Sequence, residues 1–166
     1  MATVRLRTDQ DITACLDILK AVYETSRYPV GGVGDHALYF AKDDDAWVVE
    51  TDGTVAGHIA LSKARAENVA VALWRQQHPE DNQVAVLGRL FVHPNRRKCG
   101  SASSLIHTAV EEARRRGQRL LMFALIKDQD AIRLYRKLGW QHYGTTVFKW
   151  GQENEMAAEC FTSPVL

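Results

Sequence analysis

The stretch that decides the fold runs from residue 84 to residue 105 and reads VAVLGRLFV-HPNRRKCG-SASSL. Its first nine residues are mostly apolar, which predicts a buried strand over residues 84–92. Small residues follow the basic turn, and apolar positions then recur at helical spacing as far as Gly117. This pattern predicts a helix over about 101–116, with Gly117 as its natural end. The sequence thus places a basic turn with one glycine between a buried strand and the start of a helix.

This turn has the composition of an anion-binding site. The first N–H groups of a helix have no partner within the helix, and the positive end of its dipole lies there, so a phosphate is favoured. Gly100 frees the backbone, and the small residues 101–104 allow a ligand to approach closely. Arg96, Arg97 and Lys98 add positive charge. We expect a phosphate ligand here, the alternative being a well-capped helix that binds nothing.

Other patterns predict the remaining elements. Strands are expected over residues 4–7, 46–51, 54–62, 119–125, 140–150 and 155–161, and helices over about 12–26, 69–77 and 128–138. The pair Asp52-Gly53 predicts a hairpin between the second and third of these strands. The strand, helix and strand across residues 84–125 predict a parallel unit, whereas the hairpin is antiparallel. The expected fold is α/β (α+β), with a mixed, mostly antiparallel twisted sheet of six or seven strands, about four helices and a single domain over residues 1–166.

Composition limits the classes of function. The chain has 166 residues and a net charge of +1, so no overall field recruits nucleic acid or an anionic membrane. Cys15, Cys99 and Cys160 are widely spaced and form no zinc-binding pattern. The first residues lack the apolar run of a signal peptide, and no stretch approaches the roughly 18 to 20 apolar residues of a membrane span. We expect a soluble, cytoplasmic protein that binds no metal, no nucleic acid and no membrane.

Two motifs resemble those of the GCN5-related N-acetyltransferases, the GNAT family. The central motif of that family, V-x-P-x-x-R/Q-R/Q-x-x-G-x-G/A, matches here at Val92, Pro94, Arg97, Gly100 and Ala102. A second motif, N-x-x-A-x-x-x-Y-x-x-x-G-F, matches at Ala131, Tyr135 and Gly139, with Asp128 in place of the usual Asn. Two motifs in the correct order, each on its expected element, are far more specific than either alone.

The resemblance implies that acetyl-CoA donates an acetyl group to a primary amine, by direct attack in a ternary complex. The amine would belong to a small molecule or to a protein or peptide N-terminus. By the same resemblance, the backbone N–H of Val92 polarises the thioester carbonyl, and Tyr135 protonates the departing thiolate. The residues implied in acetyl-CoA binding are Leu90, Phe91, Val92, Arg97, Lys98, Gly100, Ser101, Ala102, Ser103 and Asp128. A homodimer is a further possibility.

The acceptor site is expected beside residues 27–36, where a proline and three glycines predict a mobile loop that a short helix follows. The family places its acceptor pocket near this region, which makes Tyr28, His36 and Tyr39 candidate contacts. Arg89 either contacts an acidic acceptor or pairs with a carboxylate across the sheet. The candidates for the general base, namely His58, Glu50, Glu67 and Glu80, stay open. A non-catalytic acetyl-CoA sensor is the alternative function.

Overall fold

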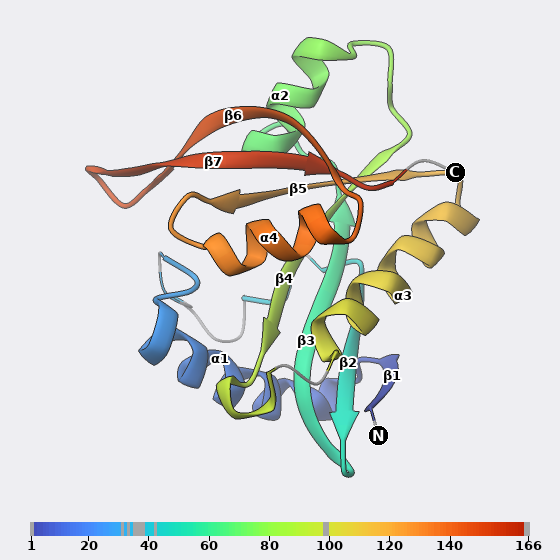
Figure 1. Cartoon of the computed structure of the whole chain (residues 1–166), viewed down its shortest axis with the longest axis vertical. Coiled ribbons are helices and arrows are strands. Elements are labelled where there is room, and N and C mark those ends of the chain that lie inside the picture. The colour runs from blue at the N-terminus through green and yellow to red at the C-terminus, as the bar shows by residue number, and fades with distance from the viewer. Residues whose placement is uncertain are drawn as a thin grey trace. The chain divides into compact units, whose positions relative to one another are not determined.

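The computed structural model describes residues 2–30, 32, 34, 39–41, 43–97 and 100–164. These residues form seven strands, which belong to one sheet in the order β1-β2-β3-β4-β5-β7-β6 (Figure 1). Strands β4 and β5 are parallel, whereas β1–β2, β2–β3, β5–β7 and β6–β7 are antiparallel. The predicted mixed, mostly antiparallel sheet is therefore confirmed. The strands are β1 (Ala2–Leu6), β2 (Asp45–Thr51), β3 (Thr54–Lys63), β4 (Val84–Val92), β5 (Arg119–Leu125), β6 (Gln141–Trp150) and β7 (Asn154–Thr162).

Four α-helices occur among the described residues, also as predicted. They are α1 (Ile12–Ser26), α2 (Val69–Gln77), α3 (Ser101–Arg115) and α4 (Gln129–Lys137), with short 3-10 turns η1 (Asp9–Asp11) and η2 (Pro94–Arg96). The chain divides into two compact units, described separately below. Unit 1 contains Met1–Ser62 and Gly88–Ala109, and unit 2 contains Lys63–Leu87 and Val110–Leu166.

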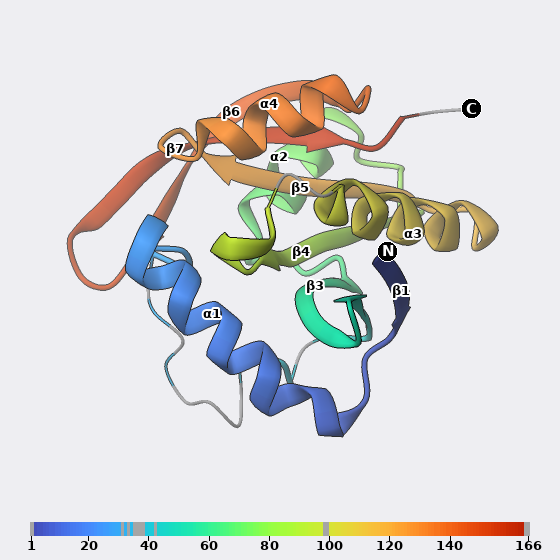
Figure 2. The ribbon, with the colours of Figure 1, turned by 60° about the horizontal axis from the view of Figure 1, so that its bottom comes forward.

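Unit 1 contains β1, β2, most of β3 and the second half of β4. Asp52 and Gly53 both have positive φ, 53° and 77°, which is the backbone conformation of the predicted two-residue hairpin. Helix α1 lies beside these strands (Figure 2) and buries one apolar stripe against them. That stripe, Cys15, Ile18, Leu19 and Val22, packs in one cluster with Val48 of β2 and Phe91 of β4.

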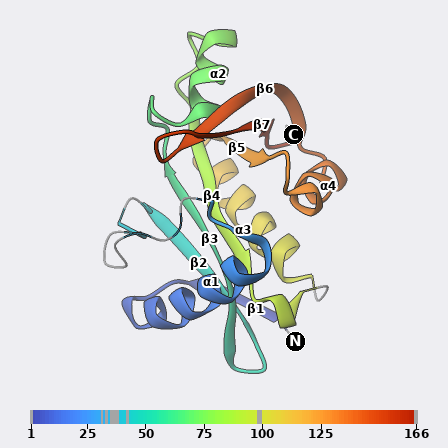
Figure 3. The same cartoon turned by 90° about the vertical axis from the view of Figure 1, so that its left-hand side faces the viewer.

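Unit 2 contains β5, β6, β7 and the first half of β4, with α2 and α4 on opposite faces of these strands (Figure 3). Successive side chains of a strand point to opposite faces. Accordingly, Cys160 of β7 packs in the cluster that contains α2, whereas its neighbour Phe161 stacks with Tyr135 of α4. Each helix thus covers one face of the same strands.

The sequence also located the end of α3. Gly117 has a φ of 71°, and the N–H of Gln118 donates to the carbonyl of Ala113 at 2.8 Å, which closes the helix as a glycine stop should. The short helix expected after residue 36 falls largely outside the described residues, and Tyr39–Ala41 form a turn. None of the helices found in the described part of the chain is long and apolar enough to cross a membrane.

Candidate functional site

Strand β4 contains a backbone irregularity at Arg89. This residue has a φ of 52°, the left-handed region that residues with a side chain rarely adopt. A left-handed residue within a strand is typical of a β-bulge, which bends the strand and interrupts its pairing. Among the described residues, β4 pairs with β5 only at Val84, Ala85 and Val86. Residues Leu90–Val92 therefore lie beyond the stretch in which β4 pairs with β5.

His58 of β3 stabilises this irregularity from within unit 1. Its Nδ1 lies 2.8 Å from the carbonyl oxygen of Arg89, and its Nε2 lies 2.9 Å from Nη1 of Arg7. A guanidinium can only donate, so Nε2 accepts and Nδ1 carries the proton that it donates to Arg89. Burial lowers the pKa of His58 to about 4, and the imidazole is neutral. Both ring nitrogens are occupied, which argues against His58 as the general base.

Asp43 completes a buried charged group that the sequence did not reveal. Its Oδ2 lies 2.9 Å from Nη1 of Arg7, and its Oδ1 lies 3.1 Å from Nε of Arg89. The carboxylate is almost fully buried, and burial raises the pKa of Asp43 while the two guanidiniums oppose that rise. Of the two roles considered for Arg89, the ion pair with a carboxylate is present. Asp43 lies in a loop and has no motif around it, so no sequence signal pointed to this partner.

The turn after β4 is held by its own side chains. Nδ1 of His93 accepts a hydrogen bond from the N–H of Asn95 at 3.1 Å, and the N–H of His93 donates to Ala56 of β3 at 2.8 Å. Arg96 donates through Nη1 to the hydroxyl of Thr51 at 2.5 Å, so its guanidinium is directed to the β2–β3 hairpin. Arg97 is exposed, and Lys98 lies outside the described residues.

The start of α3 has the features predicted for an anion site. Gly100 is exposed with a φ of 76°, and a Cβ built there meets no atom of the described residues within 4 Å. Ser101 is only 2% exposed, and its hydroxyl has no hydrogen-bond partner among the described residues. Ala102 and Ser103 are half-buried, and helical geometry leaves the N–H groups of residues 101–103 without intrahelical acceptors. A phosphate oxygen would satisfy these donors and the orphaned hydroxyl.

Asp128 and Tyr135 belong to unit 2. Asp128 precedes α4, and its Oδ1 lies 2.8 Å from Nζ of Lys127, so a neighbouring cation balances the carboxylate that replaces the usual amide. Tyr135 is 3% exposed, with its ring centroid 5.0 Å from that of Trp140 and 6.4 Å from that of Phe161. Burial raises the pKa of Tyr135, so its hydroxyl stays protonated and is a weaker acid than the hydroxyl of an exposed tyrosine.

Two of the three predicted acceptor contacts can be located. Tyr39 is buried in the cluster of unit 1 that contains Phe91, and Tyr28 packs against the same cluster. The hydroxyl of Tyr39 is buried with no hydrogen-bond partner among the described residues. His36 lies outside the described residues, as do residues 31, 33 and 35 of the predicted loop.

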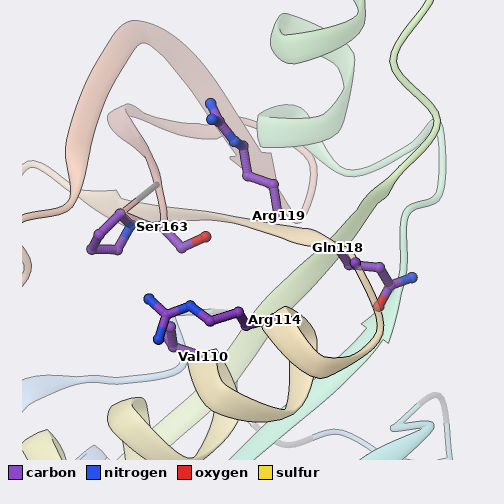
Figure 4. Close-up of a pocket in the computed structure, with 7 residues that line it drawn as sticks. Val110, Arg114, Gln118, Arg119 and Ser163 are labelled. Atoms are coloured by element: carbon purple, nitrogen blue, oxygen red, sulfur yellow. The ribbon is translucent and has the colours of Figure 1, made fainter. Parts of the chain in front are cut away.

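A separate hollow lies within unit 2, between the last turn of α3 and the start of β5 (Figure 4). Arg114 and Arg119 line it together with Ser163, and its volume is about 230 Å³. Arg114 forms an ion pair with Glu111, and Arg119 lies over the ring of Trp74. None of the site residues predicted from the sequence lines this hollow.

Comparison with known proteins decides the family. The sequence profile of the Acetyltransferase (GNAT) family matches residues 12–140, which is most of the chain. This chain belongs to the GNAT acetyltransferase family. An uncharacterised N-acetyltransferase of Methanocaldococcus jannaschii is 28% identical over 102 residues, a match that covers 60% of this chain and 41% of the relative. The match thus spans about two fifths of that relative's length.

Solved GNAT structures share the fold over nearly the whole chain. The crystal structure of a putative phosphinothricin N-acetyltransferase superposes with a TM-score of 0.75 at 17% identity, covering 100% of this chain and 99% of the other. A putative acetyltransferase from Salmonella typhimurium, solved with its cofactor acetyl-CoA, has a TM-score of 0.67 at 18% identity and covers 97% and 92% of the two chains. At these identities, the likeness shows the fold.

Proposed function

We propose that this GNAT protein is an N-acetyltransferase that transfers the acetyl group of acetyl-CoA to a primary amine of a small molecule or of a peptide N-terminus. The observation that carries the proposal is the start of α3. There, an exposed left-handed glycine and a buried serine hydroxyl, unpartnered among the described residues, follow directly on a strand whose last residues have left their parallel neighbour. Acetyl-CoA has a pyrophosphate that can bind at the helix start and pantetheine amides that can pair with the strand.

The cosubstrate has further support from the family. At least one solved neighbour with the same fold contains acetyl-CoA, and the motif residues Arg97, Gly100 and Ala102 of this chain match the family's phosphate-binding pattern. In the proposal, Leu90–Val92 pair with the pantetheine amides, and residues 100–103 hold the pyrophosphate. Arg97 and Lys98 add positive charge, and Asp128 accepts a hydrogen bond from the pantetheine arm.

The proposed reaction is direct attack by a neutral amine on the thioester carbonyl. The new C–N bond forms as the carbonyl becomes a tetrahedral oxyanion, which the backbone N–H of Val92 stabilises. Collapse of this intermediate breaks the C–S bond. Tyr135 protonates the thiolate, and the nitrogen loses a proton to solvent, which gives a neutral amide and the CoA thiol. A typical alkyl ammonium has a pKa near about 10, so the acceptor must also lose a proton before or during attack.

The residues considered for the general base are either paired or exposed, and this favours the alternative function. His58 uses both ring nitrogens, and Glu50 is 2.6 Å from Nε of Arg5. Glu67 and Glu80 are exposed. A chain without a working base would bind acetyl-CoA and transfer nothing, as a sensor of acetyl-CoA does.

One experiment separates the two functions. Acetyl-CoA binding is measured by calorimetry, and thiol release from acetyl-CoA is measured over polyamines, aminoglycosides, amino acids and peptides with free N-termini. The proposal expects binding together with thiol release on at least one class of amine. Binding without turnover on every class would favour the sensor, and no binding would reject both functions.

A further inference from the structure

The described residues of the buried charged group in unit 1 carry a net positive charge. Asp43 is the one carboxylate that pairs with Arg7 and Arg89 among the described residues, and His58 beside it is uncharged. One negative charge therefore faces two positive charges. A charge that remains partly buried is costly unless an opposite charge pairs with it, so this group favours the approach of an anion.

Arg89 is the guanidinium that an anion can reach. Its side chain is 32% exposed, against 16% for Arg7. Arg89 uses Nε to reach Asp43, and its two terminal nitrogens form no hydrogen bond with any described residue. Two terminal N–H groups side by side match the two oxygens of a carboxylate. The left-handed backbone of Arg89 is held in place by His58 and Asp43, so the side chain that it presents is preorganised.

Tyr39 provides the second observation. The guanidinium of Arg89 lies over its ring, 4.2 Å from the centroid. The Tyr39 hydroxyl is buried and forms no hydrogen bond of good geometry with a described residue. Burial raises the pKa of this hydroxyl, and the nearby Arg89 guanidinium opposes the rise. Buried hydroxyls without a partner are uncommon in folded proteins, which points to a ligand atom that this hydroxyl would contact.

We propose that Arg89 and Tyr39 together bind a carboxylate of the acceptor, so that the acceptor is a free amino acid or a similar small amine with a carboxylate. This inference rests on the proposed acetyltransferase function. Arg89 lies three residues before Val92 on β4, about 10 Å along the strand. The carboxylate site therefore lies on the same strand as the main chain proposed to polarise the thioester.

The proposal excludes whole classes of amine. Polyamines and aminoglycosides carry several positive charges and no carboxylate, so the Arg89 guanidinium would repel them and they would bind weakly. An amino acid can bind Arg89 through its carboxylate while its amine attacks the thioester. Arg89 and Tyr39 act in this account as specificity residues, and their substitution should change KM far more than kcat.

The test compares each of the twenty L-amino acids with its carboxamide, which keeps the amine and removes the negative charge. Thiol release at saturating acetyl-CoA should give at least a tenfold higher kcat/KM for the preferred acid than for its amide. Arg89→Gln should remove this preference. Arg89→Lys, which keeps the positive charge but lacks the two terminal N–H groups of a guanidinium, should retain part of it. Tyr39→Phe should lower it about threefold to tenfold with the ring in place. Lys20→Gln, an equal loss of charge at an exposed site on α1, should leave it unchanged.

A binding measurement separates failure of this inference from failure of the proposed function. Acids should raise the melting temperature of the wild type in the presence of CoA, and their amides should not. The shift should be absent in a folded Arg89→Gln protein that still binds acetyl-CoA. Turnover of amides and acids alike, or a preference that survives in Arg89→Gln and Tyr39→Phe, would overturn the carboxylate site. If nothing is acetylated, the transferase function fails, and the thermal shifts alone decide the carboxylate site.

Discussion

The Nδ1 atom of His58 lies 2.8 Å from the carbonyl oxygen of Arg89, so a fully buried imidazole binds the main chain at the bulge of β4. A left-handed arginine within a strand is strained, and it persists where surrounding contacts hold it. Here the carbonyl is held by His58, and the guanidinium is held by Asp43. The strand edge proposed for acetyl-CoA begins directly after this residue.

The pKa of His58 predicts how stability depends on pH. Burial lowers this pKa from 6.5 to about 4, so the unfolded chain takes up a proton at a higher pH than the folded chain. The contribution of His58 is therefore complete above pH 6.5 and is lost as the pH falls towards 4, by about 3 kcal/mol in total. Urea unfolding at several pH values between 7 and 4 measures it.

The raised pKa of Asp43 acts in the opposite sense over the acidic part of this range, so the wild-type curve alone does not isolate His58. His58→Gln keeps groups that can donate and accept hydrogen bonds but does not titrate. We expect the free energy of unfolding of this variant to fall less steeply below pH 6.5 than that of the wild type. Parallel curves would contradict the assignment of a buried neutral imidazole.

The lack of space for a side chain at Gly57 of β3 reflects the close approach of β3 and β4. A Cβ at Gly57 would lie 2.8 Å from the carbonyl oxygen of Phe91 and 3.1 Å from side-chain atoms of Val49 and Val92. Gly57→Ala should therefore destabilise the protein by about 1 to 3 kcal/mol, and it should weaken acetyl-CoA binding because Phe91 is displaced. Thermal unfolding and calorimetry measure the two effects.

Gly88 is the matched control on β4. A Cβ there meets no atom within 4 Å in the part of the chain that the structure describes, and its backbone is not left-handed. Gly88→Ala should keep the melting temperature or raise it slightly, because alanine restricts the unfolded chain. Equal losses in both variants would mean that close packing at Gly57 is not what limits this position.

Local signals in the sequence were sufficient to predict the helices and strands, but they did not predict the irregularity at Arg89 in β4. Asp52-Gly53 predicted a hairpin, and Gly117 predicted a helix end, because the left-handed backbone at such turns favours those residue types. Arg89 has no such preference. Its conformation depends on His58 and Asp43, which are 31 and 46 residues away in sequence, and on burial that composition does not reveal.

The candidate site likewise has parts that local sequence signals predicted and parts that they did not. The helix start at Gly100 was predictable because a glycine turn between a strand and a helix is local, and the motif order added specificity. The partly exposed side chain of Arg89 and the buried hydroxyl of Tyr39 were not predictable as a pair. Only the packing of the cluster around Phe91 brings Tyr39 into contact with β4.

Substitution of Tyr135 tests its proposed role as the general acid. Tyr135→Phe removes the hydroxyl and keeps the ring between Trp140 and Phe161, so the fold and the affinity for acetyl-CoA should be almost unchanged. We expect kcat to fall about tenfold to hundredfold, the low end for a general acid, because a CoA thiolate leaves fairly readily. Steady-state thiol release on a confirmed acceptor measures this. An unchanged kcat would leave Tyr135 with a packing role alone.

The affinity of Gly100 variants for acetyl-CoA tests the central claim most directly. Asn and Asp have the same shape, and both tolerate the left-handed backbone, which has a φ of 76° at Gly100. They differ in charge, and a carboxylate here would face the pyrophosphate. Calorimetry on folded proteins should show that Gly100→Asp binds at least tenfold more weakly than Gly100→Asn, with a difference that shrinks at high salt. A folded Gly100→Asp protein that binds acetyl-CoA as tightly as the wild type would contradict the phosphate site.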